Sequence, residues 1–416
     1  MQKWMRSIGL TCFLVAGSLL AACSSGDSGA VNENGDEIIE ITLSAWGSSP
    51  AEQRIFAETI ATFEEKHPHI SVNVDIVADQ YMDVLRTRLI GGNAADVFFL
   101  DAFEAPALMD TGVLEPLDHY ITEDFDINDF EEPLLNAFKR NDTIYGLPKD
   151  TSTLALFYNE DRFEEAGLEG PPETWKELEE YAEILTEVTG QYGFGVVADL
   201  ARLKFIAESK GGSVAENNQA SFSDPKVVEA LQPVIDMKQS GVVGVPSDVG
   251  ADWGGEMFGQ GRTAMMFEGN WTISFLEETF PNLNWKTAEI PTIDGEKGSM
   301  AYTVAYVMNK DSEKKEAAWE LISWLTGPEG MELWTRGGFA FPTRASVSEE
   351  LGLFDDEIRG PFAEAASYAT VWADDTNLPI INNNFNNEFL SAFLGQRPLD
   401  EALEEAQRVA NREIED

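Results

Sequence analysis

The sequence is poor in cysteine, histidine and basic residues, and each shortage excludes a class of protein. Its 416 residues include two cysteines and three histidines, too few for a disulfide scaffold or a Cys-rich zinc site. Only 28 Lys and Arg stand against 74 Asp and Glu, so the formal net charge is −46. Because this charge repels nucleic acid and anionic lipid, we expect neither as a partner. We also expect no metal ion and no cofactor.

Long apolar runs are missing after the N-terminus, where no segment has the roughly 18 apolar residues of a membrane span. At the N-terminus, two basic residues precede a short apolar run over 8–20, a pattern typical of a secretory signal peptide at 1–22. The Leu-Ala-Ala-Cys that ends at Cys23 resembles the lipobox of bacterial lipoproteins, which implies that Cys23 is lipidated. An ordinary signal with an incidental cysteine is the alternative.

The stretch 23–37 is rich in Ser, Gly, Asn and acidic residues, which predicts a flexible tether. Loss of 1–22 would remove two basic residues and no acids, so the mature charge would change from −46 to −48. The rest of the chain is long enough for two or three domains, and its acid excess suggests adaptation to a saline or alkaline exterior.

The folded part begins with alternating strand and helix patterns over 38–101. Apolar residues alternate before Trp46, take helical spacing over 56–63, and form a fully apolar run that ends at Asp101. This order predicts an α/β fold with a mostly parallel sheet covered on both faces. Ligands in such folds lie beyond the carboxyl ends of strands, where Trp46 and Asp101 stand. A packed aromatic and a helix N-cap are equally good explanations for these two residues.

Motifs for enzymatic chemistry are scarce. The chain has no Gly-x-Ser-x-Gly, Walker loop, His-Glu-x-x-His or Cys-x-x-Cys, and a glycosidase acid pair cannot be recognised among 74 acids. The acidic stretch 123–129 lacks the glycine and the final glutamate of a calcium loop, which favours a solvated surface. We therefore expect a protein that is not an enzyme.

Tryptophans in Gly-rich or polar surroundings are the more informative feature. Indoles stack on the flat C–H faces of sugar rings, while carboxylates and amides bind the hydroxyls. For any single tryptophan, packing in the core or between domains is as good an explanation as sugar stacking. Five such tryptophans together favour a role in ligand binding for some of them. These five are Trp46, Trp253, Trp271, Trp334 and Trp372.

Several segments resemble the sugar-binding class of bacterial extracellular solute-binding proteins (family 1), which includes maltose-binding protein. Besides the lipobox, they are YGLPKDT (145–151), LFYN (156–159), GPPETW (170–175), GRTAMMFEGNW (261–271), EAAW to TGPE (316–329) and FPTR (341–344). The resemblance covers residues 38–414 in order. It implies a two-lobe, periplasmic-binding-protein-like α/β fold with a ligand cleft between the lobes.

We expect 38–149 and 268–309 in lobe 1, 150–267 and 310–416 in lobe 2, and crossings near 147–150, 267–270 and 307–310. Carried over by position, the resemblance makes Trp271 the stacking residue and Asp150 the hydroxyl acceptor. The further ligand-binding candidates are Trp46, Asp101, Trp253, Tyr302, Phe341 and Arg344. The Asn-rich stretch 382–387 is either a cleft loop or a turn-rich connection.

The resemblance further implies a monomer that captures a sugar and delivers it to the permease of an ATP-binding-cassette (ABC) importer. The strongly negative charge of the protein favours a neutral oligosaccharide as this sugar. The place of the protein would be the extracellular face of the cytoplasmic membrane, held by the lipid anchor, or the periplasm if an outer membrane exists. Three alternatives stay open: a binding protein for a cationic solute such as a polyamine, an exported glycosidase or polysaccharide lyase, and a passive adhesion protein.

Overall fold

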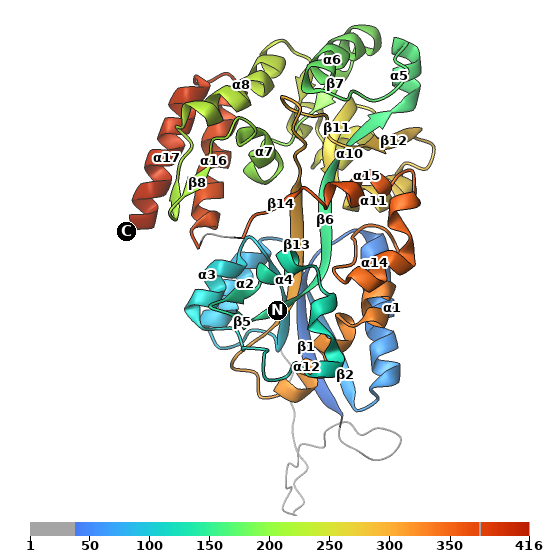
Figure 1. The fold of residues 1–416 in the computed structure, drawn as a ribbon, viewed down its shortest axis with the longest axis vertical. Coiled ribbons are helices and arrows are strands. Elements are labelled where there is room, and N and C mark those ends of the chain that lie inside the picture. Colours follow the sequence, from blue (N-terminus) through green and yellow to red (C-terminus); the bar gives the residue numbers. More distant parts are fainter. Residues whose placement is uncertain (1–37, 374–375, 416) are drawn as a thin grey trace, which may run out of the picture.

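The chain folds into two α/β lobes stacked end to end (Figure 1). The computed structural model describes residues 38–373 and 376–415. The predicted signal peptide, the lipidation site at Cys23 and the tether lie outside the described residues. Within the described part, no helix is both long and apolar enough to cross a bilayer.

The first lobe is built on three parallel strands, β1 (Ile39–Trp46), β2 (Ile70–Val77) and β3 (Val97–Asp101), of which β3 is the most deeply buried. Its core also contains the apolar faces of the surrounding helices. These helices are α1 (Pro50–Lys66), α2 (Tyr81–Ile90), α3 (Ala105–Thr111), α4 (Glu132–Asn136), α12 (Lys315–Leu325), α13 (Pro328–Thr335) and α14 (Ala345–Leu351).

The second lobe surrounds a sheet of β7 (Tyr192–Gly195), β10 (Val243–Gly244), β11 (Thr263–Gly269) and β12 (Trp285–Ala288). Separate apolar clusters fill its two sides. Its helices are α5 (Glu160–Ala166), α6 (Trp175–Thr189), α7 (Leu200–Ala207), α8 (Pro225–Gln239), α9 (Pro246–Val249), α10 (Gly254–Gly259), α11 (Trp271–Thr279), α15 (Gly360–Ala365), α16 (Leu378–Phe393) and α17 (Leu399–Glu415).

Two long antiparallel strands, β6 (Gly146–Asn159) and β13 (Met300–Met308), run through both lobes and join their sheets (Figure 1). The continuous strand order is β10-β7-β11-β6-β13-β3-β1-β2. At the crossing the register shifts, because Val304 pairs with Asp150 but Ala305 pairs with Pro148, which leaves Lys149 as an extra residue on β6. Such a bulge redirects side chains, and it lies at the junction of the lobes.

The two-lobe α/β prediction is confirmed, but parts of the predicted lobe assignment are wrong. Helices α12 and α13 pack on α1 in the first lobe, although 310–416 was assigned to the second. Conversely, α11 and β12 belong to the second lobe, where β12 pairs with β6. The reason is that the apolar face of each element finds its partner across the chain, which sequence order does not reveal.

Strand β6 passes from the first-lobe core at Leu147 to the second-lobe core at Leu154, close to the crossing predicted near 147–150, whereas the chain does not cross near 267–270 or 307–310. Strand β11 stays in the second lobe throughout, and β13 passes between the lobes around 301–303. The third connection runs between α14 and α15.

The Asn-rich stretch 382–387 is neither a loop nor a turn, because it forms the middle of α16. Ile381, Phe385 and Phe389 recur every four residues and are fully buried. Burial of this apolar stripe outweighs the weak helix preference of asparagine.

Candidate functional site

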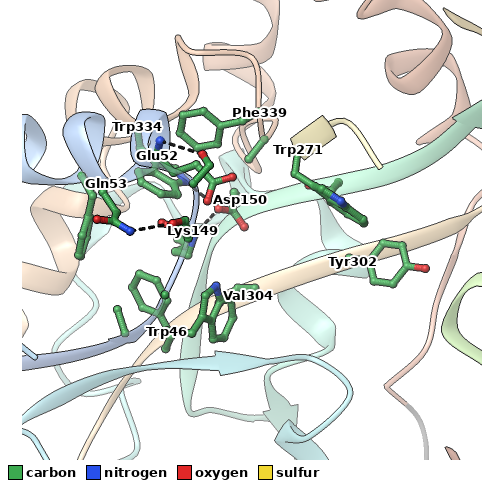
Figure 2. A pocket seen from close by; sticks show the side chains of 18 of the residues that line it. Trp46, Glu52, Gln53, Lys149, Asp150, Trp271, Tyr302, Val304, Trp334 and Phe339 are labelled. Atoms are coloured by element: carbon green, nitrogen blue, oxygen red, sulfur yellow. Dashed lines mark hydrogen bonds and ion pairs between the residues drawn. The ribbon is translucent and has the colours of Figure 1, made fainter. Parts of the chain in front are cut away.

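A cleft of about 530 Å³ lies between the lobes, in the size range of ligand pockets. Aromatic side chains dominate its lining, and Figure 2 shows several of them grouped around Lys149 and Asp150, with Trp271 and Tyr302 set toward the second lobe. The aromatic lining residues are Trp46, Phe56, Phe99, Trp253, Trp271, Phe275, Tyr302, Trp334 and Phe339. The charged ones are Glu52, Asp101, Lys149 and Asp150.

The first lobe supplies one wall from the turn between β1 and α1. Trp46 ends β1 and packs edge-on against Tyr81 and Phe99, at ring-centroid distances of 5.5 Å and 5.2 Å. The Ser49 hydroxyl then caps α1 by accepting the backbone N–H of Glu52 at 3.2 Å. The first turn of α1 faces the cleft, so Glu52 lines it. Burial at this position raises the pKa of the Glu52 carboxyl.

The floor of the cleft is the bulge of β6. Successive side chains of a regular strand point to opposite faces, but the bulge lets both Lys149 and Asp150 line the cleft. The two form a buried ion pair. The Trp334 indole N–H donates to Asp150 Oδ2 at 2.6 Å, and Lys149 Nζ lies 4.2 Å from the centroid of the Trp334 ring. These contacts fix the carboxylate in one orientation.

The second lobe supplies two indoles that lie against bare glycine backbone. A Cβ added to Gly269 would approach the Trp271 ring to 2.1 Å, and one added to Gly255 would approach Trp253 to 2.2 Å. Tyr302 packs edge-on against Trp271 with a centroid distance of 5.4 Å. Both rings therefore need glycine beneath them to reach their positions in the cleft.

A second depression of about 570 Å³ continues from the cleft beyond Trp46. It shares Trp46 and Asp101 with the cleft, and most of its other lining residues are polar or charged, with Asn383 of α16 facing it from the second lobe. The other lining residues, all of the first lobe, are Gln80, Tyr81, Met82, Asp83, Arg86 and Glu104.

The solved structures that this chain resembles are two-lobe binding proteins as well. The sequence profile of the bacterial extracellular solute-binding proteins matches residues 46–332. The chain belongs to this family. The predicted family membership is thereby confirmed.

Relatives of this solute-binding protein match it over most of their length. A binding protein of Brucella abortus is 27% identical over 94% of this chain and 95% of its own. The arabinooligosaccharide-binding protein of Bacillus subtilis is 25% identical over 79% of each chain. The solved structure of an ABC substrate-binding protein from Listeria monocytogenes in complex with cycloalternan is 25% identical with a TM-score of 0.84, over 91% of this chain and 100% of that one.

Six of the eight predicted ligand-binding residues line the cleft: Trp46, Asp101, Asp150, Trp253, Trp271 and Tyr302. The structure places Phe341 and Arg344 elsewhere. Phe341 packs in the second-lobe cluster with Phe362, and its backbone pairs with Thr151. Trp372, one of the five tryptophans in polar surroundings, packs edge-on against Phe103 outside the cleft.

Arg344 is 1% exposed and holds the acidic stretch 123–129 onto the first lobe. Its guanidinium donates to the carbonyls of Thr326 and Asp126, at 2.7 Å and 2.9 Å, and to Asp129 at 3.2 Å. An arginine with these three partners is a structural residue. The neighbouring acids did not reveal this role because their partner lies some 215 positions away in the sequence.

Sequence reasoning missed Glu52, Gln53 and Lys149 as cleft residues. Glu52 and Gln53 lie six and seven residues after Trp46, in the first turn of the next helix, so the strand-end rule that found Trp46 could also have found them. Lys149 had no such signal, because its direction depends on the bulge.

The stability of the protein is expected to decrease as pH rises through about 6, owing to Asp101. Burial is the main reason that the pKa of this carboxyl is raised to about 6, with Glu104 and Asp150 adding to it and the N–H of Phe103 opposing it. Because the folded protein holds the proton more tightly than the unfolded chain, the stabilisation is complete below about pH 4 and is lost through pH 6.

Asp101→Asn should remove this pH dependence, worth on the order of 1 kcal/mol, in urea unfolding at pH 5 and pH 8. Glu65→Gln, at an exposed carboxyl of α1, is the control and should leave it unchanged. If the change in unfolding free energy between pH 5 and pH 8 is the same in Asp101→Asn and in the unaltered protein, Asp101 is not the source of the pH dependence.

Proposed function

We propose that this solute-binding protein captures a neutral oligosaccharide between its lobes. The observation that carries the proposal is the lining of the cleft, which combines four indoles with a fixed carboxylate. The indoles are those of Trp46, Trp253, Trp271 and Trp334, and the carboxylate is that of Asp150. Indole faces stack on sugar rings, and a carboxylate accepts hydrogen bonds from their hydroxyls. Trp271 and Asp150 are the principal contacts in this proposal, with Trp46, Asp101, Trp253 and Tyr302 beside them.

The names of the relatives support a sugar over other solutes, since they refer to an arabinooligosaccharide and to cycloalternan. In this proposal, closure of the lobes about β6 and β13 encloses the sugar, and the closed protein delivers it to the permease of an ABC importer. The protein acts as a monomer and does not cleave its ligand.

A ligand longer than one ring suits the second depression. The cleft and the depression meet at Trp46 and Asp101, so a sugar that fills the first can continue into the second. The amide of Asn383 and the charged groups of the depression suit the hydroxyls of an additional ring.

A cationic solute such as a polyamine is the second candidate, and one observation favours it. Among the described residues that line the cleft, the carboxylates of Glu52, Asp101 and Asp150 outnumber the single cation, Lys149. Acids around aromatic rings form a site for ammonium groups. Asp150 is already paired with Lys149, however, which leaves less negative charge for a ligand.

Calorimetric titration with neutral oligosaccharides of two to five rings, and separately with spermidine, tests the proposal. We expect an oligosaccharide to bind, with affinity that increases up to at least three rings, and small-angle scattering to show compaction on binding. Binding of spermidine but of no sugar would support the cationic alternative. Release of reducing ends during incubation would identify a glycosidase, and no compaction with any solute would favour an adhesion protein.

We also propose that Cys23 carries the lipid anchor that keeps the protein at the outer face of the cytoplasmic membrane. Replacement by Cys23→Ser should release the protein from the membrane fraction into the medium or periplasm. The same amount of membrane-bound protein in both forms would argue for an ordinary signal peptide.

The acid excess leads to a prediction about salt. Counterions screen the mutual repulsion of 74 acidic residues, so the melting temperature should increase between low and molar NaCl. Scanning calorimetry measures this change. A melting temperature that stays constant or decreases would contradict adaptation to a saline exterior.

A further inference from the structure

A buried carboxylate lies between the backbone segments that carry the two indoles of the second lobe. Glu268, in β11, is fully buried, and its Oε2 accepts the N–H of Gly269 at 3.1 Å. Its Oε1 faces Gly254, where an added Cβ would come within 2.6 Å. Gly254 directly follows Trp253, and Gly269 lies two residues before Trp271. One side chain therefore contacts the backbone next to both indoles.

Arg202 of α7 connects this carboxylate to Trp271. Its Nε and Nη2 donate to the two Glu268 oxygens at 3.2 Å and 3.3 Å, and its Nη1 donates to Asp199 at 2.7 Å. The guanidinium carbon lies 5.7 Å from the centroid of the Trp271 ring. Arg202 is thus held by two acids while it faces the indole.

Stability alone is a weak explanation for this group of charges. Burial of an ion pair costs desolvation, and apolar residues of similar volume often stabilise a fold equally well. Burial raises the pKa of the Glu268 carboxyl, and the charge of Arg202 opposes this. Neither residue lines the cleft. What the pair does provide is orientation, because bidentate hydrogen bonds fix the direction of a guanidinium.

We propose that Arg202 and Glu268 are positioning residues that hold Trp271, and through Gly254 also Trp253, in the orientation that stacks on the sugar. The expected effect on sugar affinity rests on the proposed function, whereas the orientation of the two indoles does not depend on it. Trp271 lies between the backbone of Gly269, the Arg202 guanidinium and the edge of Tyr302, so loss of one contact frees the ring. A mobile ring must be ordered on binding, which weakens affinity.

Three variants test the proposal from different sides. Arg202→Met removes the guanidinium, Glu268→Gln keeps the shape of the side chain but removes its charge, and Gly254→Ala places a methyl group against Glu268 Oε1. Lys238→Met is the matched control in the same lobe. Lys238 is paired with Asp248 and lies 5.7 Å from the centroid of the Tyr192 ring, so its removal disturbs an equivalent contact away from the cleft.

Acrylamide quenching of the sugar-free protein provides the first measurement. The contribution of Trp271 is the difference between each variant and the same variant with Trp271→Phe. We expect quenching of Trp271 to increase in all three variants and to stay unchanged in Lys238→Met. Calorimetry with maltotriose and mannotriose provides the second measurement, in which the three variants should bind at least about tenfold more weakly than the control.

The two measurements separate the possible failures. If neither trisaccharide binds the unaltered protein, quenching still decides whether the pair orients Trp271, and the failure concerns the proposed function. Quenching unchanged in the isosteric Glu268→Gln variant, together with affinity within twofold of the control, would overturn the proposal. If Arg202→Met does not fold, Glu268→Gln and Gly254→Ala give the same decision.

Discussion

Replacement of Trp271 by alanine is expected to weaken oligosaccharide binding at least about 30-fold, which corresponds to about 2 kcal/mol. The ring lines the cleft, is supported by Gly269 and Tyr302, and begins a helix of the second lobe. A central aromatic residue with this support is where binding energy concentrates in an interface. Isothermal titration with the best-binding sugar of the length series measures the effect.

Trp175→Ala is the matched control for this experiment. Trp175 is a half-buried tryptophan in the same lobe that donates its indole N–H to Glu179 and does not line the cleft. The Trp175→Ala variant should bind sugar with the same affinity as the unaltered protein. Unchanged affinity in Trp271→Ala would show that the sugar lies elsewhere, and the proposed site would have to be abandoned.

Replacement of Asp150 by alanine is expected to cost about 3–5 kcal/mol of folding stability, in addition to any loss of binding. The substitution leaves Lys149 buried without its carboxylate and removes the acceptor of the Trp334 N–H. An uncompensated buried charge is among the most destabilising changes in a protein. Chemical denaturation monitored by circular dichroism measures the difference.

The double variant Lys149→Met/Asp150→Ala provides the decisive comparison, because removal of both charges is often close to neutral. We expect it to be more stable than Asp150→Ala alone. A surface pair, Lys66 and Glu329, serves as the control, and Glu329→Ala should cost no more than about 1 kcal/mol. Equal stability of Asp150→Ala and the unaltered protein would contradict the importance of the buried pair.

The sequence located most of the cleft because two of its signals are local. Trp46 and Asp101 end strands whose apolar patterns are unmistakable, and parallel strands bring their carboxyl ends to one edge. Trp271 and Asp150 were located by family motifs of a few adjacent residues. In each case the information needed lies within a short stretch of chain.

Arg344 shows the limit of such reasoning. The motif FPTR belongs to the family, but its arginine is bound by carbonyls and an acid from distant loops, so it holds the fold together instead of facing the cleft. The Asn-rich helix α16 is a similar case, because its apolar stripe matters only once the rest of the second lobe is present to bury it.

The sequence by itself determined the α/β class, the family and the strand-end residues of the site, because periodicity and motif are properties of neighbouring residues. Only the tertiary structure decided which lobe α12 and α13 join, that a bulge turns Lys149 into the cleft, and that Glu268 contacts the supports of two indoles. Each of these depends on contacts between residues far apart in the chain, which form only when the strands and helices pack together.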